Sequence, residues 1–179
     1  MHSALAVCQG QAGTFLREGK VTVAHVGDGR AMLVHPNRGR FLTRDHRVDD
    51  RVERARIEAA GGHIVDPYVY RGEAGLMPTR SLGDRWFRSV GVIATPDVAT
   101  RTLTGADISL VVASDGLWDV LPSAEVARVV REAGRPQRAA EALGQAVERR
   151  RGRDNLAVIV VGLATTPGHR QASPAGRRA

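Results

Sequence analysis

The alternation of apolar and polar residues predicts a chain built largely from strands. Residues 20–26 alternate between polar and apolar side chains, the turn Gly27-Asp28-Gly29 follows, and an apolar run then covers residues 31–34. Two such runs around a Gly-Asp-Gly turn predict a β-hairpin with Asp28 at its corner. Farther along, residues 108–113 form a continuous apolar run, typical of a strand buried on both faces, and residues 155–163 form another nearly apolar strand.

Helical patterns lie between these strands. Asp50, with Glu53 three residues later, resembles a capping box, and the helix that it begins should end at Gly61-Gly62. Residues 122–133 and 136–150 have the apolar spacing of amphipathic helices. Antiparallel-type strands with a few intervening helices predict an α+β fold in which helices cover sheets.

Two segments carry weaker patterns. Residues 66–88 mix Pro, Gly, Tyr and Trp without periodicity, which predicts a loop with a short strand at residues 76–80. A further strand is expected within residues 96–103. The Pro, Gly, Ser and Arg content of residues 165–179 predicts a disordered tail, which leaves residues 1–164 as one domain.

Composition narrows the class of protein. No stretch of the 179 residues is long and apolar enough to span a bilayer, the first ten residues lack a signal-peptide pattern, and Cys8 is the single cysteine, so we expect a soluble cytoplasmic protein. The net charge of +7 invites a nucleic-acid partner. However, Lys20 is the only lysine among 26 basic residues, and the arginines are mostly dispersed, which disfavours a selected binding patch.

Carboxylates lie where the two most apolar strands meet turns. Asp115 directly follows one strand and Asp154 precedes the other, so antiparallel pairing would bring both to one edge of the sheet. Asp119 and Asp28 are placed to join them, and Mg²⁺ prefers such oxygen ligands. The alternative stays open, because aspartate beside glycine is also an ordinary turn residue that binds its own backbone.

Six short motifs follow one another along the chain, namely Val26-Gly27-Asp28-Gly29-Arg30, Leu42-Thr43-Arg44-Asp45-His46, Glu58-Ala59-Ala60-Gly61-Gly62, Thr79-Arg80-Ser81-Leu82-Gly83-Asp84, Ala113-Ser114-Asp115-Gly116-Leu117-Trp118-Asp119 and Asp154-Asn155. In order and in approximate spacing they resemble successive motifs of the protein phosphatase 2C family. The resemblance implies a β-sandwich of antiparallel sheets flanked by helices, with metal ions at one end. It also implies hydrolysis of phosphoserine and phosphothreonine in proteins by a metal-activated water.

The resemblance also implies roles for single residues. Asp115 and Asp154 would ligate a pair of Mg²⁺ or Mn²⁺ ions, and Asp28 and Asp119 would lie near an additional, weaker metal position. A structural role is expected for the other motif residues. These are Arg80, Ser81, Gly83 and Asp84 in a turn under the site, Gly61 and Gly62 at a helix end, Trp118 in the core, and the histidines His25 and His46.

The match has a gap at its start. The family pattern begins with a phosphate-binding arginine, a Glu-Asp pair and an Asp-Gly-His-Gly motif, whereas this sequence contains no Asp-Gly-His. We therefore assign no catalytic residue, and we expect a domain without its N-terminal third, with exposed strand edges and little activity of its own. Two alternatives stay open, namely a non-catalytic regulatory or interaction module of the same fold, and a true start upstream of Met1.

Overall fold

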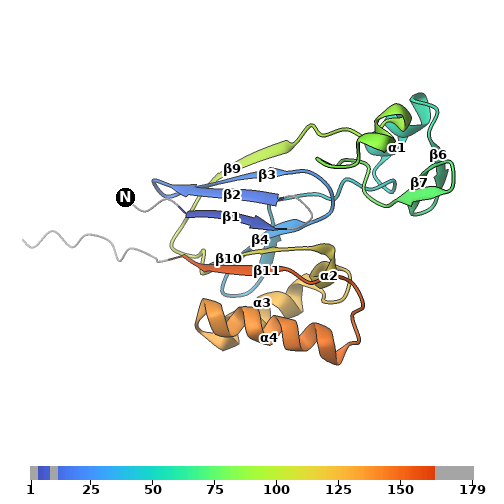
Figure 1. Cartoon of the computed structure of the whole chain (residues 1–179). Helices are drawn as coiled ribbons and strands as arrows, with labels where there is room; N and C mark the ends of the chain where they lie inside the picture. The colour runs from blue at the N-terminus through green and yellow to red at the C-terminus, as the bar shows by residue number, and fades with distance from the viewer. Residues whose placement is uncertain (1–3, 9–11, 164–179) are drawn as a thin grey trace, which may run out of the picture.

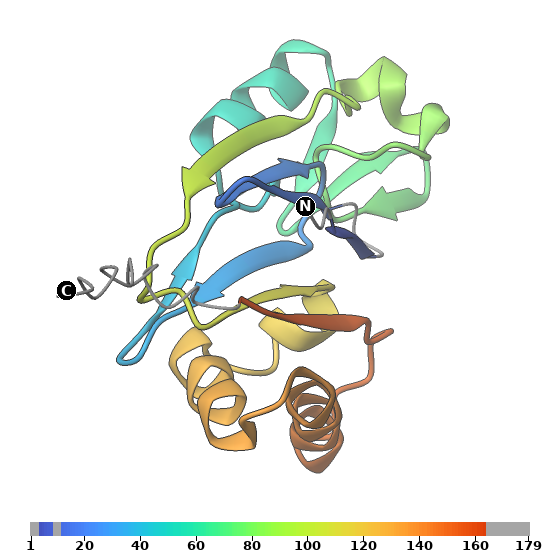
Figure 2. The same cartoon turned by 90° about the vertical axis from the view of Figure 1, so that its left-hand side faces the viewer.

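The computed structural model describes residues 4–8 and 12–163, and the predicted tail at residues 165–179 lies outside them. Two antiparallel sheets face each other, two helices cover the outer face of the second sheet, and a side lobe projects from one end (Figures 1 and 2). The predicted α+β sandwich flanked by helices is therefore confirmed. The side lobe consists of α1 (Arg51–Ala59), β6 (His63–Val65), β7 (Tyr68–Arg71), β8 (Ala74–Leu76) and the 3₁₀ helix η1 (Arg85–Val90).

The first sheet has the strand order β1-β2-β3-β9. Its strands are β1 (Ala4–Cys8), β2 (Ala12–Arg17), β3 (Lys20–His25) and β9 (Asp97–Thr102), and every neighbouring pair is antiparallel. Val21 and Val23 on β3 are fully buried because they face the second sheet. The expected strands at residues 20–26 and 96–103 are thus both present.

The second sheet has the order β11-β10-β4-β5 and holds the most buried strand. Its strands are β11 (Val158–Gly162), β10 (Ser109–Ala113), β4 (Arg30–Val34) and β5 (Gly39–Phe41). Every residue of β10 is buried, as its unbroken apolar run predicts, because one face meets the first sheet and the other meets the helices. The register places Ala113 opposite both Arg30 and Val158, so these strand ends lie at one edge.

The predicted hairpin around Gly27-Asp28-Gly29 is wrong. β3 pairs with β2 and β9, whereas β4 pairs with β10 and β5, so the turn carries the chain from one sheet to the other. The reason is that both strands have an apolar face, and these faces are buried by packing across the sandwich rather than by edge pairing. Asp28 still lies at a corner between strands, as expected.

The helical layer matches its prediction within one residue. α3 (Ser123–Ala133) and α4 (Pro136–Arg149) pack their apolar stripes, including Val126, Val130 and Leu143, onto β4 and β10. A short helix that the sequence did not predict, α2 (Asp115–Trp118), begins directly after β10. Trp118 is buried, and its Nε1–H donates to the Ala113 carbonyl at 2.9 Å, which is the expected core role.

The side lobe differs most from its prediction. Residues 66–88 contain β7, β8 and η1 in place of a loop with a strand at 76–80, because strands of three or four residues are too short to show periodicity. Asp50 caps α1 as expected, accepting from the N–H groups of Val52 and Glu53. Glu53 does not complete a capping box, because its carboxylate instead accepts hydrogen bonds from Arg56, Thr79 and Arg80.

One edge of the sandwich is apolar, and the described residues provide no protection for it. β11 pairs only with β10 among the described strands, and its valines and Ile159 remain half-buried. No charge, proline or bulge interrupts this strand, and natural edge strands usually carry such devices to prevent pairing with other chains. Beside it lies a hollow of about 570 Å³ lined by Val158, Ile159 and the start of α4.

We therefore expect the purified chain to associate with itself through β11 as concentration rises. Val160→Lys should shift the population toward monomer, because a lysine on an edge strand is one of the devices by which natural sheets prevent pairing with another chain. Light scattering coupled to size exclusion measures the change. Val98→Lys, on the exposed edge strand β9, is the matched control, and an equal effect of both lysines would contradict the assignment to β11.

Candidate metal centre

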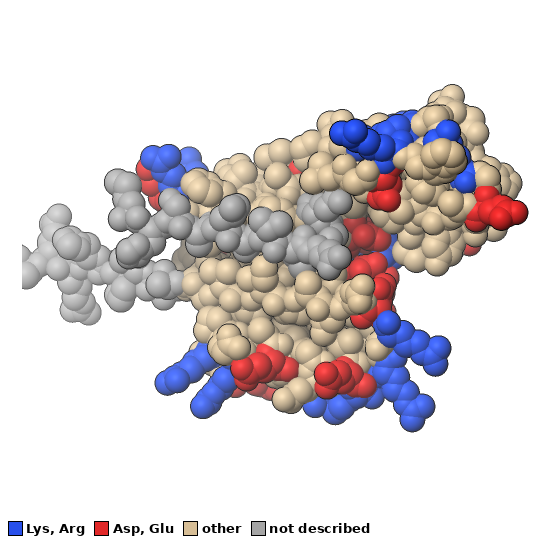
Figure 3. Space-filling view, viewed as in Figure 1, with Lys and Arg blue, Asp and Glu red and all other residues tan. Residues whose placement is uncertain are grey.

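Four aspartates, here called the acidic edge, converge at the end of the sandwich next to the side lobe. Asp115 begins α2 directly after β10, Asp119 caps that helix, Asp28 precedes β4, and Asp154 precedes β11. The antiparallel register of these strands brings their connecting turns to the same edge, as the sequence predicted for Asp115 and Asp154. Figure 3 shows acidic side chains gathered where the lobe meets the sandwich.

Asp115 is the centre of this group. Burial raises the pKa of its carboxyl, and the neighbouring charges of Asp28, Asp154 and Asp119 raise it further, while Arg47 opposes them. The carboxylate therefore lies in a strongly negative environment, which is what a site for a hard cation requires. Its Oδ1 accepts from the Gly116 N–H at 3.0 Å, so the turn-type hydrogen bond considered from the sequence is also present.

Ser114 and Gly116 hold the Asp154 loop against α2. The Ser114 hydroxyl donates to the Asn155 carbonyl at 3.0 Å and accepts from the Ala157 N–H at 3.1 Å. A Cβ on Gly116 would lie 2.5 Å from the Asn155 carbonyl oxygen, so only glycine permits this approach. Asp154 itself is exposed, and it accepts from the Asn155 N–H at 2.7 Å. Sequence reasoning assigned no function to Ser114, because its partners lie about forty residues away.

Arg47 lies among the aspartates of the acidic edge, and the sequence did not predict this position. Its Nε donates to Asp28 Oδ2 at 2.9 Å, and its two terminal nitrogens donate to the Asp119 carboxylate at 2.8 and 3.3 Å. Burial alone would lower the pKa of Arg47, but the hydrogen bonds to Asp119 and the charge of Asp28 raise it well above its usual range. The one available signal was its position directly after the Asp45-His46 motif.

Two stacked histidines support the corner that carries Asp28. The rings of His25 and His46 lie 4.6 Å apart, and His46 Nδ1 accepts from the Gly27 N–H at 3.0 Å. Because Nδ1 is an acceptor, the proton of neutral His46 lies on Nε2, which is 3.2 Å from Asp97 Oδ2. These contacts support the structural role expected for both histidines.

Arg80 joins the side lobe to the sandwich. It donates to the buried carboxylate of Glu53 on α1 and, through Nη1 at 2.9 Å, to Asp97 on β9. Burial would raise the pKa of Glu53, but hydrogen bonds from two arginines and a threonine hold it far below its usual range. The following turn is closed by a hydrogen bond from Ser81 to Asp84, which agrees with the expected structural role of this motif.

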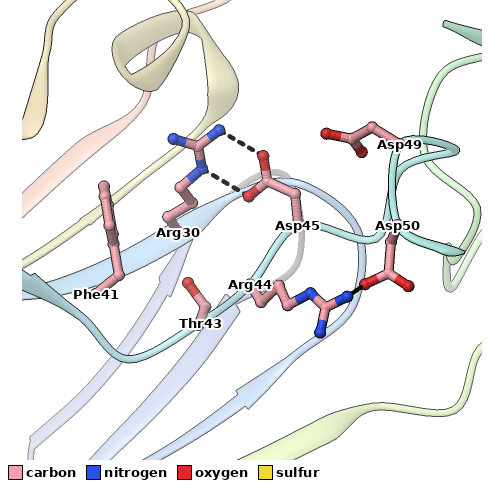
Figure 4. A pocket seen from close by; sticks show the side chains of 7 residues that line it. All are labelled: Arg30, Phe41, Thr43, Arg44, Asp45, Asp49 and Asp50. Carbon is pink, nitrogen blue, oxygen red and sulfur yellow. Dashed lines mark hydrogen bonds and ion pairs between the residues drawn. The ribbon is translucent and has the colours of Figure 1, made fainter. Parts of the chain in front are cut away.

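A hollow of about 350 Å³ adjoins the acidic edge (Figure 4). Within it, Arg30 forms a two-pronged ion pair with Asp45 at 2.6 and 2.5 Å, and Arg44 pairs with Asp50. Arg30 Nη2 also lies 3.8 Å from Asp119 Oδ1, so the hollow opens beside the predicted metal ligands. It is lined by Arg30, Phe41, Thr43, Arg44, Asp45, Asp49 and Asp50.

The donor chemistry of the acidic edge fits a hard divalent cation. All four side chains are carboxylates, and Arg47 already shows that a cation is accommodated between three of them. Among the described residues, no three acidic, histidine or cysteine side chains converge closely enough to enclose an ion unaided. Mg²⁺ tolerates this, because it commonly retains several waters and takes only one or two protein carboxylates.

A family model described as protein phosphatase 2C matches residues 7–156 of the chain. The chain belongs to the protein phosphatase 2C family. Over 144 residues it is 35% identical to protein phosphatase 2C homolog 1 of Saccharomyces cerevisiae, covering 80% of this chain and 50% of that protein. Probable protein phosphatase 2C 71 of Arabidopsis thaliana is 35% identical over 143 residues, which cover 79% of this chain and 32% of that protein. The resemblance inferred from the motifs is thereby confirmed.

Solved structures support the same assignment. Serine-threonine phosphatase 2C from Toxoplasma gondii superposes with a TM-score of 0.73 at 28% identity, covering 89% of this chain and 58% of that one. A Caenorhabditis elegans sex determining protein shares the fold, with a TM-score of 0.72 at 23% identity. The match covers 83% of this chain and 38% of that one. The chain thus spans only part of the length of its relatives and is a partial phosphatase 2C domain. None of its described helices is long and apolar enough to cross a membrane.

Crowding of carboxylates should cost the metal-free protein stability. Because the pKa of Asp115 is raised in the folded state, its contribution to stability is present when it is protonated and is lost as pH rises through that pKa. Asp115→Asn keeps the Oδ1 acceptor and removes the charge, so we expect its melting temperature in EDTA at pH 7 to rise by about 1–3 °C. The exposed Asp66→Asn is the control, and a lower melting temperature for Asp115→Asn would contradict this account.

The histidine pair should make the fold sensitive to mild acid. Burial, and then the neighbouring His46, lower the pKa of His25 to about 4, so the folded state favours neutral His25. Its contribution to the free energy of unfolding is complete above the ordinary histidine pKa near 6.5 and is lost as pH falls from there toward 4. The expected loss in the free energy of unfolding between pH 7 and 5 is roughly 2 kcal/mol. Urea unfolding of His25→Gln should show a smaller loss over this interval, whereas the exposed His63→Gln should behave as wild type.

Proposed function

We propose that this chain carries the aspartate-rich part of a phosphatase 2C metal centre, and that the assembled centre hydrolyses phosphoserine and phosphothreonine in proteins. The observation that carries the proposal is the convergence of Asp28, Asp115, Asp119 and Asp154 at one end of a phosphatase 2C sandwich. The names of its relatives, which include a serine-threonine phosphatase 2C, support this reaction class.

The residues of the proposed centre are either metal ligands or residues that position those ligands. Asp115 and Asp154 would hold Mg²⁺ or Mn²⁺, and Asp28 and Asp119 would serve an additional, weaker position. When bound, these ions supply a water activated for attack on phosphorus. Ser114 and Gly116 set the distance between the Asp115 helix and the Asp154 loop, while His46 holds the corner that presents Asp28.

Among the described residues, we assign no side chain to the role of general acid and no arginine to phosphate binding. His25 is buried and neutral, and His46 is bonded at both ring nitrogens. The arginines that contact the acidic edge, Arg30 and Arg47, already bind carboxylates. We therefore infer that this chain alone has weak or no activity. The proposed setting is cytoplasmic, with phosphorylated proteins as substrates.

A second candidate is a non-catalytic interaction module derived from the same fold. The observation that favours it is that, in the described part of the chain, no three acidic, histidine or cysteine side chains lie close enough together to enclose an ion unaided. The two candidates differ in metal binding, because an ion that binds only the folded state raises the melting temperature.

The decisive experiment measures hydrolysis of p-nitrophenyl phosphate and of a phosphothreonine peptide, together with the melting temperature, with and without Mn²⁺. We expect Mn²⁺ to raise the melting temperature of wild type but not of Asp115→Ala, and turnover to be at least about a hundredfold below that of a complete relative. Ordinary Mn²⁺-dependent turnover that Asp115→Ala abolishes would refute the weak activity. A wild-type melting temperature indifferent to Mn²⁺ would favour the non-catalytic module.

A further inference from the structure

The guanidinium of Arg47 occupies the space between three carboxylates of the acidic edge. It donates to Asp28 Oδ2 and to both oxygens of Asp119, and its Nη2 lies 3.7 Å from Asp115 Oδ2. Its side chain is only 17% exposed and that of Asp28 is 9% exposed, so the contact with Asp28 is largely shielded from water and from salt, whereas Asp119 is 42% exposed. No ion pair joins Arg47 to Asp154 among the described contacts.

The backbone of Arg47 is fixed from both sides. His46 is buried and bonded to Gly27 and Asp97, and Val48 is buried in the core of the side lobe. The Arg47 carbonyl accepts from the Asp50 N–H at 3.1 Å, at the start of α1. The side chain can therefore leave the carboxylates by rotating about its own bonds, while its Cα stays in place.

We propose that Arg47 is a built-in counter-cation that competes with a divalent ion for Asp28 and Asp119. The inference rests on the proposed metal centre. An ion that bound these oxygens would lie within a few ångströms of the guanidinium, and two cations at that separation in a partly buried site repel strongly. The oxygen lone pairs that would face the ion already accept hydrogen bonds from Arg47.

The competition divides the acidic edge into two positions. The position served by Asp115 and Asp154 is accessible with Arg47 in place, because the contact with Asp115 is long and none exists with Asp154 among the described pairs. The position served by Asp28 and Asp119 opens only when Arg47 withdraws. Arg47 thus stabilises the metal-free fold and weakens the second position.

The test compares Arg47→Gln with wild type by calorimetric titration with Mn²⁺ in the absence of substrate. We expect one binding event to tighten by at least about tenfold, because the competing charge is gone, while the other event changes little. The metal-free melting temperature should fall. Arg128→Gln, which removes a surface ion pair with Glu132 on α3, is the matched control and should leave both events unchanged. Asp28→Asn combined with Arg47→Gln should abolish the gain.

A second measurement uses the wild-type protein, so its result does not depend on whether a variant folds. In ¹⁵N spectra of wild type, the Arg47 Nε–H should be protected from solvent exchange without metal and should lose this protection as Mg²⁺ is added. The Arg80 Nε–H, bonded to buried Glu53, should stay protected throughout.

The outcomes separate the two proposals. Equal Mn²⁺ affinities for wild type and Arg47→Gln, or an Arg47 Nε–H that stays protected when the centre is saturated, would overturn the competition and leave the metal centre intact. Absence of any Mn²⁺ binding by either folded protein would overturn the metal centre, and with it the competition.

Discussion

The burial of β10 is the constraint on which the rest of the structure depends. This strand of five residues is wholly enclosed, with the first sheet on one face and α3 and α4 on the other. Its backbone groups must therefore be paired on both sides, which β4 and β11 do in antiparallel register. Three turns then emerge at one edge, and each brings an aspartate. The acidic edge is a geometric consequence of filling the core.

The same convergence creates an electrostatic cost. Burial raises the pKa of Asp115, and the nearby charges of Asp28, Asp154 and Asp119 raise it further, because like charges disfavour one another's ionisation. Arg47 offsets this repulsion from a loop that belongs to neither β10 nor its neighbours, and Arg30 adds a more distant positive charge. In the metal-free fold, Arg47 thus supplies positive charge to the acidic edge.

The side lobe is coupled to the sandwich through polar contacts. Glu53 of α1 is bonded to Arg80, Arg80 is bonded to Asp97 on β9, and Asp97 meets His46, which holds the Gly27 corner. Every member of this chain of contacts carries or receives a directional hydrogen bond, which fixes orientation more than it adds stability. The corner that presents Asp28 is therefore positioned by residues from three separate segments.

Sequence alone determined the features that depend on neighbouring residues. The apolar run of β10, the stripes of α3 and α4, and the Asp50 cap were predictable, because periodicity and capping are local properties. The family motifs also located all four aspartates of the acidic edge. Only the tertiary structure decided that β3 and β4 belong to different sheets, that residues 66–88 contain β7, β8 and part of η1, and that Arg47 and Ser114 reach the acidic edge. Those outcomes depend on which distant surfaces bury one another, and a linear pattern does not record that choice.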